Sequence, residues 1–152
     1  MKEVKGNFAG KGKRIAVIIS RFNEFISGQL LSGCADTLAK SGVRDEDISV
    51  VWTPGAFEIP QVLAKLETKK FDAVIALGVI IRGDTPHFDY IASEAVKGIA
   101  KVSLDRNIPV IFGIITADTM EQAIERAGTK QGNKGRDAAL AALEMASIYT
   151  QI

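Results

Sequence analysis

Four short apolar runs alternate along the chain with stretches in which apolar residues recur at helical spacing. The runs are rich in β-branched residues and too short to span a membrane, which is typical of strands buried on both faces of a parallel sheet. The pattern therefore predicts strands at residues 14–20, 48–53, 72–81 and 108–116.

Helical spacing predicts the elements that follow these strands. Residues 118–121 have the spacing of a capping box, with Asp118 in place of the usual serine or threonine, so we expect a helix to begin there. Glycines and polar residues at 128–135 then interrupt the helical pattern. The remaining helices are expected at residues 24–41, 59–69, 88–106 and 136–149.

Strand and helix alternate throughout, which favours an α/β fold with a parallel sheet. We predict a three-layer sandwich in a single domain spanning residues 1–152: a flavodoxin-like four-stranded parallel sheet flanked by helices on both faces. Residues 3–10 precede the first strand and contain few apolar side chains. This segment either adds an edge strand to a neighbouring subunit or is disordered.

Composition excludes several classes of function. The net charge is +1 and basic residues are spread among acidic ones, which argues against a nucleic-acid binder with a broad basic face. The one cysteine, Cys34, excludes an internal disulfide, and with a single histidine it leaves too few ligands for a zinc site. We expect Cys34 to be a buried structural thiol. The chain has no signal-peptide pattern and no run of 18 apolar residues, so we expect a cytoplasmic protein without membrane contact.

The residues that end the third predicted strand are the strongest candidates for chemistry. The apolar run stops at Arg82, and residues 83–89 read GDTPHFD. We expect Thr85 to cap a helix and Pro86 to take its first position. Open α/β sheets bind ligands at the carboxyl ends of such strands, and the first amides of a helix bind anions. His87, the only histidine, either exchanges protons beside that anion site or is a surface residue without a role.

Further candidates are two residues in loops that the fold would bring to the same edge and a set of basic residues near the C-terminus of the chain. Phe22 follows the first strand, where its ring either stacks on a planar heterocycle or packs on the helix that begins next. Glu58 either accepts hydrogen bonds from a polyol or is only a favourable charge at a helix N-terminus. Arg126, Lys130 and Lys134 are spaced by four; they form a solvated basic face, or Arg126 clamps a phosphate.

Five ordered sequence blocks narrow these alternatives. No Walker motif or G-x-G-x-x-G pattern follows any predicted strand, so a nucleotide cradle of those types is unsupported. The chain instead resembles the 6,7-dimethyl-8-ribityllumazine synthase family over essentially its whole length. The blocks that carry the resemblance are RFN at 21–23, PGAFEIP at 54–60, GVIIRGDTPHFDY at 78–90, FG at 112–113 and EQAIERAGTKQGNKG at 121–135.

The resemblance implies an activity. Members of this family condense 5-amino-6-(D-ribitylamino)uracil with 3,4-dihydroxy-2-butanone 4-phosphate, release phosphate and water, and use no cofactor. The reaction is the penultimate step of riboflavin biosynthesis. The active site lies between adjacent subunits, so the resemblance also implies a homo-oligomer.

The resemblance assigns one group of residues to the ribitylaminouracil. Phe22 would stack on the pyrimidine, Glu58 would accept hydrogen bonds from ribityl hydroxyls, and the backbone of residues 79–81 would contact the uracil edge. The group it implies consists of Phe22, Ala56, Phe57, Glu58, Val79, Ile80 and Ile81, with Phe112 and Lys134 from the neighbouring subunit.

A second group is assigned to the phosphate and to proton transfer. Backbone amides of Asp84 and Thr85 would hold the phosphate together with Arg126 of the neighbouring subunit, and His87 would carry the proton. No metal is implied. The carboxylate of Asp84 must face water if its amide makes the contact, because a carboxylate turned inward would repel the phosphate.

The turn at residues 128–135 bears on assembly. It has no insertion, as in family members that close pentamers into a sixty-subunit icosahedral shell, so we expect such a shell with a lone pentamer as the alternative. A riboflavin synthase is a candidate partner for the shell.

Two rival functions are less consistent with these residues. A riboflavin synthase of the same fold would need no phosphate site, and a shell protein without catalysis would need neither Glu58 nor His87.

Overall fold

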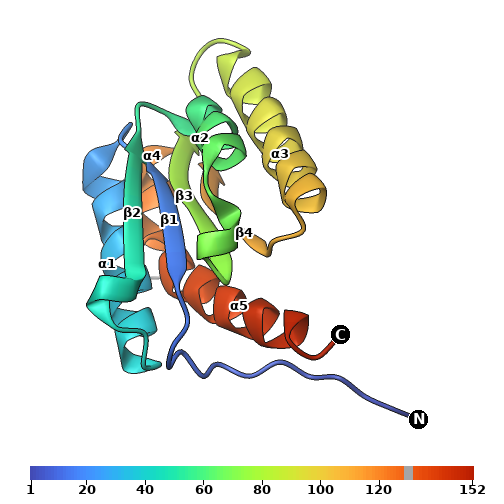
Figure 1. The fold of residues 1–152 in the computed structure, drawn as a ribbon. Coiled ribbons are helices and arrows are strands. Elements are labelled where there is room, and N and C mark those ends of the chain that lie inside the picture. Colours follow the sequence, from blue (N-terminus) through green and yellow to red (C-terminus); the bar gives the residue numbers. More distant parts are fainter. Residues whose placement is uncertain (129–131) are drawn as a thin grey trace.

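The computed structural model describes residues 1–128 and 132–152 as a four-stranded sheet with helices on both faces (Figure 1). The strands are β1 (Ile15–Ser20), β2 (Ile48–Thr53), β3 (Ala73–Ile81) and β4 (Val110–Ala117). They pair in parallel in the order β2-β1-β3-β4. The predicted three-layer α/β fold and its parallel sheet are therefore confirmed.

The helices divide between the two faces. α1 (Glu24–Lys40) and α5 (Lys134–Tyr149) cover one face together with the short α4 (Met120–Arg126), and α2 (Ile59–Lys65) and α3 (His87–Arg106) cover the other. Three single 3₁₀ turns complete the elements: η1 (Asp45–Asp47), η2 (Ala56–Glu58) and η3 (Thr68–Lys70). Among the described residues, no helix is both long and apolar enough to cross a membrane.

The two central strands supply core residues to both faces. In β1, Ile15, Val17 and Ile19 pack with α1 and α5, whereas Ala16 and Ile18 pack with α2 and α3. All five side chains are fully buried, which explains why this strand has no alternating polar positions. Cys34 lies in the α1 side of the core, as expected, and burial raises the pKa of its thiol to about 12. The thiol is therefore not a nucleophile near neutral pH.

One predicted helix is too long. We expected residues 59–69 to be a single helix, but α2 ends at Lys65 and η3 follows. The side chain of Arg106, at the end of α3, donates hydrogen bonds to the carbonyls of Ala64 (2.9 Å) and Leu66 (3.0 Å). These bonds satisfy carbonyls at the end of α2 that a longer helix would have used itself.

Two helix starts were also assigned to the wrong residue. Pro86, not Thr85, is the N-cap of α3; Thr85 Oγ1 only accepts a 3.4 Å hydrogen bond from the N–H of His87, two residues on. Thr119, not Asp118, caps α4 by accepting from the N–H of Gln122. The capping-box spacing exists one residue later, between Thr119 and Gln122.

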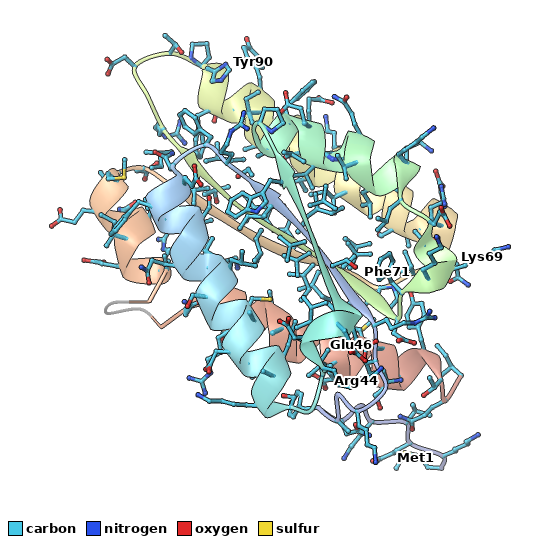
Figure 2. All side chains as sticks on the ribbon, turned by 60° about the vertical axis from the view of Figure 1, so that its left-hand side comes forward. Met1, Arg44, Glu46, Lys69, Phe71 and Tyr90 are labelled. Carbon is cyan, nitrogen blue, oxygen red and sulfur yellow. The ribbon has the colours of Figure 1, made fainter. Side chains whose placement is uncertain are left out.

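The N-terminal segment is extended and forms no strand within this copy. It runs beside α5 and leaves the body of the molecule, with Met1 at its far end (Figures 1 and 2). The side-chain amide of Gln151 donates to the carbonyl of Lys5 at 3.1 Å, and the N–H of Gly10 donates to the carbonyl of Ser41 at 2.8 Å. The segment is thus held against the domain at Lys5 and at Gly10. Pairing with a neighbouring subunit stays a prediction.

One side chain joins α1, α4 and α5. Asn133 Oδ1 accepts from the N–H of Arg136 and caps α5, while Asn133 Nδ2 donates to the carbonyls of Ala127 and Gln29, each at 3.0 Å. A Cβ atom at Gly33 would overlap the Asn133 amide, so this glycine leaves the space that the amide occupies. The turn before Asn133 includes Thr129, Lys130 and Gln131, which lie outside the described residues.

We expect Asn133→Ala to lower the free energy of unfolding by about 2–3 kcal/mol, because it removes a helix cap and leaves two carbonyls without their donor. Thr119→Ala is the matched control: it removes a cap that makes only one such bond and should cost about 1 kcal/mol. Urea unfolding at a fixed protein concentration measures both. Equal losses in the two variants would contradict the joining role of Asn133.

Candidate active site

The strand order creates a crevice between β1 and β3. The chain leaves β1 toward β2 on one side, and it leaves β3 toward β4 on the other. The loops at the carboxyl ends of β1 and β3 therefore diverge, and the space between them is where open α/β sheets bind ligands.

A cavity of about 510 Å³ lies at this point. It is lined by residues from four segments: the loop after β1, the loop after β2, the last residues of β3, and the turn into α3 with the first turns of that helix. These residues are Phe22, Pro54, Gly55, Ala56, Phe57, Glu58, Val79, Ile80, Ile81, Gly83, Thr85, His87, Phe88 and Ile91. Nine of the residues selected from the sequence therefore meet in one cavity.

In this crevice the backbone of β3 extends beyond its last pair with β1. β1 pairs with β3 only as far as Leu77, whereas β4 pairs with β3 through Ile81. In the described part of the chain, the β1-facing backbone edge of residues 79–81 consequently has no strand beside it. Peptide N–H and C=O groups along this edge are available to a planar ligand with its own donors and acceptors.

Phe22 lies at the opening of the cavity. Asn23 has a left-handed backbone (φ 58°) and begins α1 directly after Phe22, so the chain reverses sharply at this point. The side chain of Phe22 is 64% exposed. Its ring is therefore not buried under α1, which favours the stacking alternative over the packing one.

The loop after β2 brings a carboxylate to the cavity. Thr53 Oγ1 donates to the carbonyl of Gly55 at 2.8 Å and fixes the loop, and η2 then turns Glu58 back toward it. A Cβ atom at Gly55 would lie 3.1 Å from Glu58 Oε2, so the carboxylate lies directly over this glycine. Glu58 is half-buried among apolar neighbours and can accept hydrogen bonds from a ligand.

The turn between β3 and α3 forms the outer wall. Residues 82–87 are all exposed, and Gly83, Thr85 and His87 line the cavity. His87 is the first residue of α3, beside helix amides that have no partner within the helix. Asp84 lines no part of the cavity. The arrangement provides an imidazole and an anion-binding helix end at one side of the crevice.

Five lining residues were not selected from the sequence: Pro54, Gly55 and Gly83 from loops, and Phe88 and Ile91 from α3. Phe88 and Ile91 recur at helical spacing on α3. Both are half-buried and contribute to the cavity wall. The same helical spacing is typical of a core face and of a cavity wall, so the sequence held no signal to separate them.

Three of the selected residues lie away from this cavity. Phe112 lines a second groove of about 400 Å³ on the β4 side of α3, together with Phe88, Val96 and Thr116. The guanidinium of Arg126 donates to the carbonyl of Thr116 at 2.9 Å. Because Thr116 is near the carboxyl end of β4, Arg126 lies at the edge of the sheet where the cavity is also found. Lys134 begins α5. Within one copy, Phe112, Arg126 and Lys134 do not complete the cavity.

Of the comparisons with known proteins, the family model identifies the family of this chain. A de novo designed Rossmann fold protein is 14% identical, with 74% of this chain and 91% of that chain covered, but its TM-score of 0.42 is too low to support any inference. The model of the family 6,7-dimethyl-8-ribityllumazine synthase matches residues 12–150, which include every residue of the cavity. The chain belongs to the 6,7-dimethyl-8-ribityllumazine synthase family.

Proposed function

We propose that this protein condenses 5-amino-6-(D-ribitylamino)uracil with 3,4-dihydroxy-2-butanone 4-phosphate to form 6,7-dimethyl-8-ribityllumazine. The observation that supports this most strongly is the crevice between β1 and β3. In this chain, which belongs to the family, the crevice contains an exposed aromatic ring, an unpaired strand edge, a carboxylate and the only histidine. Each of these groups matches one part of the two substrates.

The ribitylaminouracil occupies the inner part of the crevice. Phe22 stacks on the pyrimidine ring, because a flat apolar face pairs well with a heterocycle. The free backbone edge of residues 79–81 pairs with the donors and acceptors of the uracil. The ribityl chain extends along residues 56–58, where Glu58 accepts hydrogen bonds from its hydroxyls.

The butanone phosphate occupies the side formed by the turn into α3. Amides of Asp84 and Thr85 and the first amides of α3 bind the phosphate, since helix N-termini favour anions. The carboxylate of Asp84 stays outside the cavity and does not oppose this charge. Arg126 of the neighbouring subunit supplies the positive charge that the phosphate requires.

The reaction depends mainly on holding the two substrates together. The 5-amino group of the uracil forms an imine with the ketone and releases water, and phosphate is then eliminated. After tautomerisation the ribitylamino nitrogen attacks the remaining carbonyl and closes the ring with loss of a second water. His87 gives and takes protons beside the reacting carbons, a role that contributes roughly 10²-fold. Positioning contributes the larger part of the rate.

A product assay tests the proposal. Purified protein given both substrates should form lumazine, and His87→Ala should lower kcat about 10²-fold without abolishing the reaction. Lys101→Ala, on α3 and outside both the cavity and the groove of Phe112, is the matched control and should retain wild-type kcat. Riboflavin formed from lumazine, or no product at all, would contradict the proposal and favour a riboflavin synthase or a shell protein.

We further propose that the active site is shared between two subunits. The cavity residues and the pair Phe112 and Arg126 lie on different sides of α3 in one copy. A head-to-tail contact in a ring would bring the β4 edge of one subunit to the crevice of the next. Each active site would then combine Phe22 of one chain with Arg126 of another.

Mixed oligomers test this division. Phe22→Asp and Arg126→Ala homo-oligomers should each lose at least about 90% of their activity, because one removes the stacking face and the other a charge-assisted contact. Oligomers refolded from an equal mixture should recover about a quarter of the wild-type activity, because that fraction of interfaces pairs two intact halves. Activity no higher than in the separate variants would contradict a shared site.

The assembly we propose is a ring of five subunits that closes further into a sixty-subunit icosahedral shell. The argument is the uninterrupted turn at residues 128–135, whose described part includes left-handed glycines at Gly128 (φ 129°) and Gly132 (φ 76°). In this assembly the extended N-terminal segment pairs with an edge strand of a neighbour, and a riboflavin synthase is a candidate guest.

Sedimentation velocity of the full chain at micromolar concentration tests the size of the assembly. A shell predicts one fast species with a mass of about sixty chains, because closed symmetric assemblies populate few intermediates. A single species of pentamer mass would contradict the shell and leave the catalytic proposal intact.

A further inference from the structure

Arg82 is the first residue after β3, and its contacts reach β4, α3 and the loop between β4 and α4. Its N–H donates to the carbonyl of Ala117, at the end of β4, at 2.9 Å. Its Nε donates to Asp118 Oδ1 at 2.8 Å, and its NH1 lies 3.5 Å from Asp89 Oδ1 in the first turn of α3. The guanidinium carbon lies 4.4 Å from the centre of the Phe88 ring. One side chain therefore connects the end of β4 with the start of α3.

These contacts bracket the turn that lines the cavity. The turn at residues 83–86 leaves the sheet after Arg82 and leads into α3 at His87. The next two residues of α3, Phe88 and Asp89, are those that Arg82 contacts. The turn itself has little packing: its residues are exposed, and a Cβ atom at Gly83 would meet nothing within 4 Å. The conformation of the turn consequently depends mainly on its two ends, which Arg82 holds together.

The backbone of Asp118, the residue that anchors Arg82, is itself held by a hydrogen bond. The N–H of Asp118 donates to Gln122 Oε1 at 2.9 Å, and Asp118 directly precedes the N-cap of α4. The hydrogen bond that Arg82 donates to Asp118 is also the main cause that raises the pKa of the Arg82 guanidinium. A planar guanidinium can bind a carboxylate and stack on a ring at the same time, which an ammonium group cannot do.

We propose that Arg82 is a positioning residue for the phosphorylated substrate: by joining Asp118 to Phe88 and Asp89, it holds the turn at residues 83–86 in the shape that binds the phosphate. The proposal rests on the proposed function of the same site. Arg82 does not line the cavity, and two carboxylates neutralise its charge. It therefore acts through the geometry of the turn and not as a direct ligand of the phosphate.

Three variants separate these two roles. Arg82→Gln removes the charge and the contacts, Arg82→Lys keeps the charge but loses the planar group, and Asp118→Asn keeps Arg82 but weakens its anchor. A positioning role predicts that all three raise the KM for the butanone phosphate about tenfold and change the KM for the ribitylaminouracil by less than about twofold. A direct ligand role predicts wild-type behaviour for Arg82→Lys, and tighter substrate binding for Asp118→Asn because a nearby negative charge is lost.

The chain offers a matched control in Arg44. This arginine also makes two ion pairs, with Asp47 (2.7 Å) and Glu46 (2.6 Å), but it precedes β2 at the opposite end of the sheet. Figure 2 shows Arg44 and Glu46 far from Tyr90 at the start of α3. Arg44→Gln should leave both KM values unchanged.

Hydrogen–deuterium exchange supplies a readout that does not depend on activity. Amides of residues 83–89 should exchange faster in Arg82→Gln and Asp118→Asn than in the wild type or in Arg44→Gln. Unchanged exchange in both variants, or a wild-type KM in Arg82→Lys, would overturn the positioning role. Absence of lumazine from the wild-type enzyme would instead overturn the proposed function, and the exchange data would still decide whether Arg82 holds the turn.

Discussion

The parallel pairing of β1 with β3 is the constraint on which the rest of the structure depends. Both strands are buried on both faces, so they fix the centre of the sheet and the positions of the helices above and below it. Their crossovers run in opposite directions. The ladder also ends at Leu77 while β3 continues to Ile81. The four residues of β3 beyond the last β1 pair thereby leave a backbone edge open at the point where the loops diverge.

Some residues of the site are fixed by core packing, whereas others are exposed. Residues 79–81 and Ala56 belong to the buried framework, and their place is set by core packing. Phe22, His87 and the turn at residues 83–86 are exposed, so no core packing fixes them. Their positions depend on local devices: the left-handed Asn23 next to Phe22, the hydrogen bond between Thr53 and Gly55 beneath Glu58, and Arg82 across the turn. Preorganisation of a binding site commonly rests on such supporting contacts.

Sequence patterns predicted the strands and the edge at which the site lies, because burial on both faces leaves a continuous apolar run and parallel strands place their carboxyl ends together. They failed where a distant side chain decides the outcome. α2 ends early because Arg106 reaches carbonyls 40 and 42 residues away, and Asn133 bonds to Gln29 across 104 residues. The start of α4 was wrong by one residue because Asp118 and Thr119 are neighbouring polar residues that can both cap a helix, and the start of α3 was wrong because Pro86 takes the N-cap position without a side-chain cap. The supporting role that we propose for Arg82 depends on contacts with Asp118, which no local pattern encodes.

We propose above all that the crevice between β1 and β3 binds the ribitylaminouracil. A crystal structure of the protein with this substrate bound, in the absence of the butanone phosphate, tests it directly. We predict that the pyrimidine stacks on Phe22 and forms hydrogen bonds with the backbone of residues 79–81. The ribityl hydroxyls should donate hydrogen bonds to Glu58. A substrate bound in the groove of Phe112, with this crevice empty, would contradict it.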